Sequence, residues 1–148
     1  PHAAYMQTVG LESLDARYRV QSSNALELAT RLLKVPQIKR VNYTGLPDNP
    51  FYEIAKRQYG NTSGAMLTID LADKASALRF IDRLKVIHRA SNLFDNRSLA
   101  IHTASTIFGT FSGSQRRAMD VLDTTIRISV GLEHVDDLYE DIVQAVQE

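Results

Sequence analysis

Apolar residues recur at helical spacing through the first quarter of the chain. They return at steps of three, four and seven from Leu11 to Leu32, while most charged residues fall on other faces. Gly10 interrupts the pattern at a cost of about 1 kcal/mol relative to alanine, which favours close packing or a bend there. Because Pro36 cannot continue a helix, the pattern predicts one long helix over residues 1–35.

Beyond Pro36 the pattern alternates between the two kinds of regular structure. Short apolar or alternating runs predict strands at residues 38–43, 65–71, 99–101 and 125–130. Helical spacing returns at residues 50–59, 73–87, 114–122 and 134–146, and residues 88–112 show no helical period. Strands that alternate with helices, without an internal repeat, predict an α/β fold in which helices pack on one sheet.

Composition narrows the class of protein. The 148 residues suffice for one domain, and 44% hydrophobic with 23% charged residues is typical of globular chains. A net charge of zero argues against nucleic acid as a partner, and short apolar runs argue against a membrane span. The absence of cysteine excludes disulfides and thiol chemistry and fits a cytoplasmic protein. Because the chain begins at Pro1 without a Met, we expect a fragment or a processed product.

No catalytic set is visible in the residues themselves. The four histidines lack the spacing of metal ligands, so no metal site is expected. Gly109 and Gly113 flank a short segment, but no strand followed by a Gly-Lys-Ser/Thr helix start accompanies them, as a phosphate loop requires.

Arg127 is the residue that stands out. It lies inside an apolar strand, on the same face as Ser129. Its guanidinium is costly to bury unpaired and suits a bidentate grip on a carboxylate. Two interpretations stay open: a strand residue that is paired with an acid or hydrated, or an anchor for an anionic substrate. Asn92 is similarly open, as an ordinary turn residue or a ligand.

Seven segments, in order, resemble the motifs of a known family. They are PHAA with GLESL at residues 1–14, NA with LA at 24–29, VNYTGLP at 41–47, AKRQ at 55–58, GAML at 64–67, SLAIHTAST at 98–106 and IRISVGLE at 126–133. The chain thereby resembles the C-terminal domain of the Cys/Met-metabolism pyridoxal-phosphate enzymes. These include cystathionine γ-synthases and lyases, methionine γ-lyases and O-acetylhomoserine sulfhydrylases.

The resemblance implies a domain organisation. Residues 1–35 would be a linking helix, and residues 36–148 a small α/β domain with a mainly antiparallel sheet of about four strands. Pyridoxal phosphate would be held by a larger cofactor domain that is absent from this chain, because none of the lysines here matches the family's cofactor lysine. No catalytic or cofactor-binding residue is therefore expected in the chain, and the fragment alone should be inactive. The implied partners are that cofactor domain and other copies of the protein, as a homotetramer.

The resemblance also assigns substrate contacts. The family's arginine in the motif at Arg127 binds the α-carboxylate of an amino-acid substrate, and the residue at Asn92, with Leu93 beside it, contacts the same carboxylate. Sulfhydrylases mostly carry Asn at the position of Asn92, whereas lyases and γ-synthases mostly carry Ser.

Three residues are candidates for specificity: Arg97, Phe94 and Thr106. Cystathionine-handling members tend to have Glu at the position of Arg97, where a cation would repel the distal ammonium of cystathionine. Phe94 replaces a common Gly, Thr103 a common Pro, and residues 107–108 a usual Thr-His. These departures leave the thiol and the leaving group open.

The preferred hypothesis is an O-acetylhomoserine sulfhydrylase, which makes homocysteine by γ-replacement. The alternatives within the family are cystathionine or methionine γ-lyase, cystathionine γ-synthase and β-lyase. A hypothesis of another class is a free-standing amino-acid-binding or interaction module on the same scaffold. The gene sequence upstream of Pro1 discriminates, because only the enzyme requires a preceding cofactor domain.

Overall fold

Five strands form one sheet in the order β1–β2–β5–β4–β3. The computed structural model describes residues 1–147. The strands are β1 (Arg40–Asn42), β2 (Met66–Asp70), β3 (His88–Arg89), β4 (Leu99–His102) and β5 (Thr125–Ser129). All neighbours are antiparallel except β3 and β4, which are parallel. The expected α/β fold with a mainly antiparallel sheet is therefore confirmed, with five strands where about four were expected.

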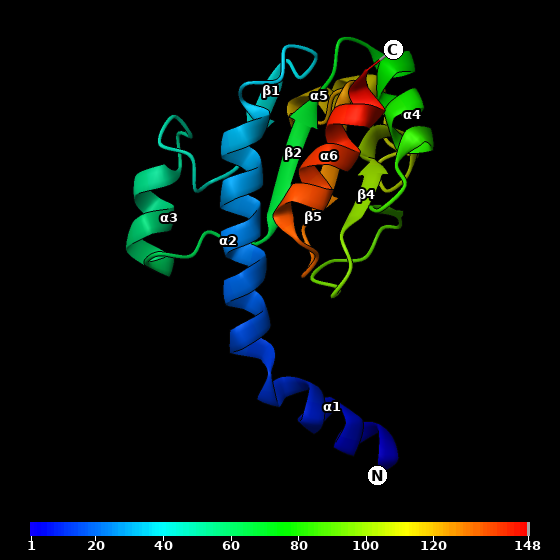
Figure 1. Cartoon of the computed structure of the whole chain (residues 1–148). Coiled ribbons are helices and arrows are strands. Elements are labelled where there is room, and N and C mark those ends of the chain that lie inside the picture. Colours follow the sequence, from blue (N-terminus) through cyan, green and yellow to red (C-terminus); the bar gives the residue numbers. More distant parts are fainter. Residues whose placement is uncertain (148) are drawn as a thin grey trace.

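Three of the helices cover one face of this sheet. The helices of the chain are α1 (His2–Glu12), α2 (Leu14–Leu32), α3 (Tyr52–Tyr59), α4 (Lys74–Arg83), α5 (Gly113–Ala118) and α6 (Val135–Val146), with a short 3-10 turn at Thr103–Ser105. Figure 1 shows α2, α6 and α4 side by side in front of the strands, while α3 stands apart at the sheet's edge. This packing leaves the opposite face of the sheet without a comparable layer of helices.

Burial follows the alternation of the strands. Ile126 and Ile128 of β5 are completely buried in the core, together with Leu28 of α2 and Ile142 of α6. Side chains at successive strand positions point to opposite faces, so Arg127 and Ser129 belong to the face away from these helices. The alternation along β5 thus places the core residues on one face of the sheet and the polar residues Arg127 and Ser129 on the other.

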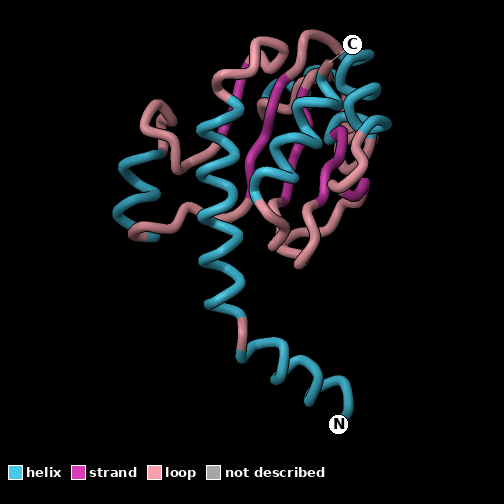
Figure 2. The backbone as a smooth tube through the Cα atoms, in the orientation of Figure 1, coloured by secondary structure: helices cyan, strands magenta, loops and turns pink. Residues whose placement is uncertain are grey.

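The predicted long helix is wrong in one respect, because it is two helices. The chain breaks at Ser13, and Figure 2 shows α1 turning away from α2 at this point. The break falls three residues after Gly10, the expected position of a bend. The Arg17 guanidinium donates to the Ser13 hydroxyl and to the Gly10 carbonyl, and so ties the two helices together. No residue of α1 is buried.

The helix predicted over residues 73–87 ends at Arg83, for a reason that lies far along the chain. The Asp141 carboxylate, which is only 4% exposed, accepts the backbone N–H groups of Lys85, Val86 and Ile87 at 2.9–3.0 Å. Satisfying these donors from α6 lets the chain leave the helix and run directly into β3.

Candidate functional site

Arg127 occupies the middle of the sheet, on the central strand β5. It pairs in register with Thr68 of β2 on one side and Ile101 of β4 on the other. Its guanidinium donates one hydrogen bond, from Nη2 to the Ser91 carbonyl oxygen at 2.7 Å. Within residues 1–147 no carboxylate forms an ion pair with it. The described residues therefore do not show the acid-paired arginine of the first interpretation, and a hydrated strand residue and a substrate anchor both stay open.

Partial burial also affects the electrostatics of Arg127. Desolvation lowers the pKa of its guanidinium below the ordinary value, because no neighbouring anion offsets the loss of water. An arginine remains protonated in proteins even so, and it keeps four N–H donors beyond the one that Ser91 accepts. The arrangement presents a half-desolvated cation that an incoming carboxylate would neutralise.

The loop that follows β3 is held against this arginine by side chains from two other elements. The Phe94 N–H donates to the Ser129 hydroxyl at 3.1 Å, and Gln21 of α2 donates to the Asp95 carbonyl at 2.8 Å. The ring of Tyr18 lies beside that of Phe94, with centroids 6.2 Å apart. Since the Ser91 carbonyl accepts a hydrogen bond from Arg127, the residues that follow Ser91 in the loop lie near the guanidinium.

Asn92 and Leu93 follow Ser91 directly and are both exposed. The structure therefore brings these two predicted contacts to the neighbourhood of Arg127, with their side chains accessible. Phe94 has a backbone φ of 52°, in the left-handed region that favours glycine. The glycine expected here from the resemblance would adopt this conformation without strain, whereas Phe94 adopts it with a ring that lies beside Tyr18.

The far end of the same loop is fixed by Glu133. Its carboxylate accepts the Ser98 N–H at 2.6 Å and the Ser98 hydroxyl at 2.8 Å, and that hydroxyl accepts the Gly131 N–H. A Cβ at Gly131 would lie 2.5 Å from the Ser98 nitrogen, which leaves no room for a side chain. The glycine and the glutamate of the segment at 126–133 therefore serve the shape of the loop.

Arg97 and Thr106 are placed less directly. Arg97 is exposed, and both its N–H and its guanidinium donate to Asp95, which lowers the pKa of that carboxyl. Its partner is thus within the loop, and no contact joins it to Arg127 in the described residues. The Thr106 hydroxyl donates to the His102 carbonyl at 2.9 Å.

A pocket of about 580 Å³ connects Thr106 with Ser91. Its walls come from α4, the loop after β3, β4 and residues 105–107, and they are largely apolar, with Ile81, Ile101 and Ile107 among them. Ser91, whose carbonyl accepts from Arg127, lines this pocket, whereas Arg127 itself does not. Thr106 and Ile107 therefore share a pocket with Ser91, and Arg97 does not line it.

Sequence reasoning missed the residues that support the loop. Ser129 could have been found, because its alternation with Arg127 puts both on one face. Gln21 carried no signal beyond being a polar residue in a predicted helix, and it is 3% exposed only because it reaches the Asp95 carbonyl. The acceptor for Arg127 is a backbone carbonyl, which no side-chain pattern reveals.

The residues around Arg127 do not by themselves make a site for pyridoxal phosphate. Such a site needs a lysine for the aldehyde and donors for the phosphate. The hydrogen bonds of the described residues place none of the five lysines beside Arg127 or Ser91; Lys39, for example, donates to Pro36.

Within residues 1–147, no helix is long and apolar enough to cross a membrane.

The fold defines the class of protein: a mixed α/β domain similar to solved structures of pyridoxal-phosphate enzymes. The family model described as Cys/Met metabolism PLP-dependent enzyme matches residues 1–147, so the chain belongs to this family. The membership expected from the seven motifs is confirmed, and with it the dependence of the family on pyridoxal phosphate.

Several relatives resemble the chain over nearly its whole length. O-acetyl-L-homoserine sulfhydrylase 1 of Thermus thermophilus is 40% identical over 99% of this chain and 35% of its own. L-methionine γ-lyase of Pseudomonas putida is 34% identical over 99% of this chain and 37% of its own. The solved O-acetylhomoserine sulfhydrylase of Wolinella succinogenes is 42% identical, with a TM-score of 0.86 over 99% of this chain and 39% of that one. The chain thus spans about a third of the length of its relatives.

A further solved structure bears on the cofactor. It is a Campylobacter jejuni protein, provisionally assigned as an O-acetylhomoserine (thiol)-lyase, that carries a pyridoxyl-lysine phosphate. It is 36% identical, with a TM-score of 0.91 over 94% of this chain and 33% of that one.

Proposed function

We propose that this chain is the substrate-carboxylate-binding part of a pyridoxal-phosphate enzyme of sulfur amino-acid metabolism, and that its reaction is the sulfhydrylation of O-acetylhomoserine. The observation that carries the proposal is the guanidinium of Arg127, half-buried, without an acid partner in residues 1–147 and fixed at one edge by Ser91. A carboxylate that accepts its remaining donors replaces the lost hydration and gains two parallel hydrogen bonds.

The chain's own part in the reaction is to bind and orient. A bidentate Arg127 would fix the position and plane of the α-carboxylate and so restrict the directions open to the Cα–H bond, while the loop with Asn92 would cover one side of the carboxylate. Bound pyridoxal phosphate supplies the electron sink that makes this C–H bond acidic. We assign its lysine and phosphate contacts to a cofactor domain outside these residues, which agrees with relatives about three times as long.

The choice of sulfhydrylation rests on two residues and on the relatives. Asn92 stands where the sulfhydrylases of the family mostly have Asn, and Arg97 stands where cystathionine-handling members tend to have Glu. Relatives named for sulfhydrylation of O-acetyl- or O-succinylhomoserine are 40% and 37% identical to the chain. Elimination of a thiol from methionine is the second candidate, because a methionine γ-lyase is 34% identical.

The decisive test is a pair of assays on the full-length protein loaded with pyridoxal phosphate. We expect formation of homocysteine from O-acetylhomoserine and sulfide to be faster than release of thiol from methionine. Arg97→Glu should raise the turnover of cystathionine, with Arg57→Glu, an exposed arginine on α3, as the matched control. Faster thiol release from methionine in the unmodified protein would favour the lyase instead.

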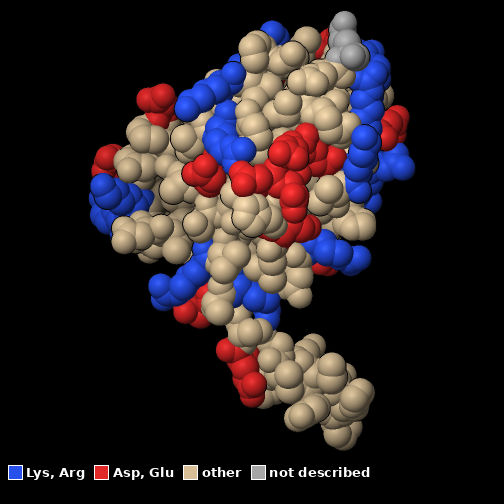
Figure 3. All heavy atoms as spheres, in the orientation of Figure 1, with Lys and Arg blue, Asp and Glu red and all other residues tan. Residues whose placement is uncertain are grey.

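We also propose that α1 contacts another part of the assembly, either the cofactor domain or a second subunit of a homotetramer. The support is its surface: Tyr5, Met6 and Leu11 are 65%, 54% and 64% exposed, and α1 buries nothing in this domain. Figure 3 shows this arm as an almost uncharged projection below the charged body. Sedimentation of the full-length protein should give a tetramer, and Tyr5→Glu with Met6→Glu should weaken it.

A further inference from the structure

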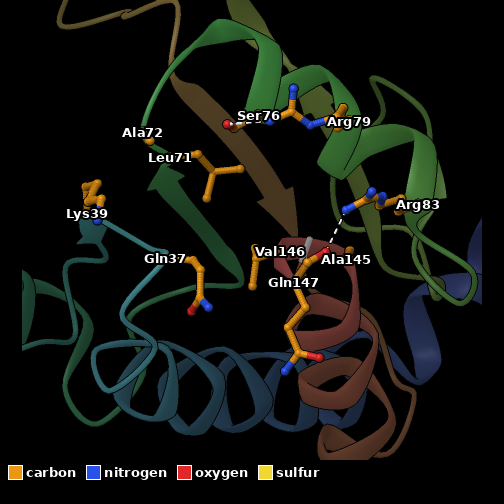
Figure 4. A pocket seen from close by; sticks show the side chains of 10 residues that line it. All are labelled: Gln37, Lys39, Leu71, Ala72, Ser76, Arg79, Arg83, Ala145, Val146 and Gln147. Carbon is orange, nitrogen blue, oxygen red and sulfur yellow. Dashed lines mark hydrogen bonds between the residues drawn. The ribbon is translucent and has the colours of Figure 1, made fainter.

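A second pocket, of about 410 Å³, lies on the helix-covered side of the sheet, away from the face of Arg127. It opens between the segment before β1, the end of β2 and helices α4 and α6, as Figure 4 shows. Lys39, from the segment before β1, and Arg79 and Arg83, both of α4, line it. No aspartate or glutamate of the described residues is among its walls.

The two arginines differ from most others in the chain. Six arginines are ion-paired within residues 1–147, namely Arg19, Arg31, Arg40, Arg89, Arg97 and Arg116. Arg79 and Arg83 have no such partner among the same residues. Three cations around one pocket, without an acid in its described walls, create a local positive potential in a chain of zero net charge.

Neutral groups already orient the cationic side chains. Arg79 donates to the Ser76 hydroxyl at 3.0 Å, and Arg83 donates to the Gln147 carbonyl at 2.6 Å. Lys39 donates to the Pro36 carbonyl at 3.1 Å. The nearby Asp73 carboxylate caps α4 by accepting the Ser76 N–H at 2.7 Å. Hydrogen bonds from Ser76 and the charge of Arg79 lower the pKa of the Asp73 carboxyl, so Asp73 partly offsets the charge of Arg79. The contacts of Arg83 and Lys39 are with neutral carbonyl groups and leave their charges uncompensated.

The rest of the pocket indicates the kind of ligand. Leu71, Ala145 and Val146 contribute apolar wall, so the pocket offers contact for carbon as well as for charge. Its volume lies in the range of sites for small organic molecules. We propose that this pocket binds a small organic anion with two or more negative charges, either a phosphorylated compound or a di- or tricarboxylate, held by Arg79, Arg83 and Lys39.

The test is isothermal titration of the full-length protein, loaded with pyridoxal phosphate so that its cofactor site is filled. The probes are pyrophosphate and citrate, each compared with sodium chloride at equal ionic strength. We expect saturable binding of at least one probe with a dissociation constant in the millimolar range or below. Preference for pyrophosphate identifies a phosphorylated ligand, and preference for citrate a polycarboxylate.

Variants decide whether the binding occurs in this pocket. Arg79→Gln with Arg83→Gln should raise the dissociation constant of the probe about tenfold or more, since charge-assisted hydrogen bonds are stronger than neutral ones. Arg57→Gln with Arg117→Gln removes the same charge from exposed positions outside the pocket and should leave binding unchanged. Lys39→Gln provides an independent test if the double variant unfolds. Absence of saturable binding, or equal weakening in the control pair, would overturn the proposal.

Discussion

The two faces of strand β5 differ in role, although their residues alternate along the same strand: one face packs in the core and the other carries Arg127. Ile126 and Ile128 are completely buried under α2 and α6, whereas Arg127 between them is half-buried and meets only the Ser91 carbonyl. Both faces share one backbone and one register, so the strand that is fixed by the core also fixes the arginine. Core packing on one side of β5 therefore also fixes the position of the Arg127 backbone on the other.

The largest effect should come from the core face. Ile128→Ala removes a completely buried side chain and leaves a cavity, which should lower the free energy of unfolding by about 3–4 kcal/mol. Urea denaturation of the 148-residue chain measures this loss, with the exposed Ile54→Ala as control. A loss below about 1 kcal/mol would mean that this face is not what holds β5 in place.

The complementary change on the other face should affect function and leave stability nearly intact. In the full-length enzyme, Arg127→Ala should cost about 3 kcal/mol in kcat/KM, the size expected when one member of a buried charged pair is removed. Arg127→Lys keeps the charge and loses the planar fork, so KM should rise more than kcat falls. The absorbance of bound pyridoxal phosphate should be unchanged in both variants, because Arg127 is assigned to the substrate and not to the cofactor. Wild-type kcat/KM in a folded Arg127→Ala protein loaded with pyridoxal phosphate would show that Arg127 does not bind the α-carboxylate.

A third change extends the comparison to two aspartates of the same helix. Asp141→Ala would leave the N–H groups of Lys85, Val86 and Ile87 without their acceptor, and should destabilise the chain by about 2–3 kcal/mol. Asp137→Ala, at an exposed position of α6, should change stability by about 0.5 kcal/mol or less. Thermal unfolding of both variants measures the difference, and equal melting temperatures would contradict the role given to Asp141.

The sequence predicted what depends on local pattern. The strands at 65–71 and 125–130 appeared as alternating or β-branched runs, and the structure has β2 and β5 there. It did not predict β3, because His88 and Arg89 are both exposed and form a strand only by pairing with β4. Nor could it show that the helix stops at Arg83, since the responsible carboxylate lies more than fifty residues later. Long-range acceptors leave no local signal.

The same limit applies to the site. Arg127 could be singled out because a cation inside an apolar strand is unusual, and its face followed from alternation. The break at Ser13, by contrast, was not predicted: the low helix propensity of Gly10 indicated only close packing or a bend within one long helix. The Arg17 side chain reaches back across the junction, and such a contact depends on the folded geometry of both helices.

The smallest effect is expected at Ser129, which lies on the face of Arg127 but touches no substrate in the proposed arrangement. Ser129 lies two positions from Arg127 on the same face and accepts the Phe94 N–H, which holds the loop that carries Asn92. Ser129→Ala removes one neutral hydrogen bond, which should weaken substrate binding by about 1 kcal/mol. Since the loop covers the carboxylate and the arginine stays in place, the loss should appear as a severalfold rise in KM with kcat nearly unchanged. Ser23→Ala, at an exposed position of α2, is the control, and Ser129→Thr should restore part of the loss by keeping the hydroxyl. A fall in kcat at constant KM would instead show that the loop acts on the reacting atoms rather than on the carboxylate.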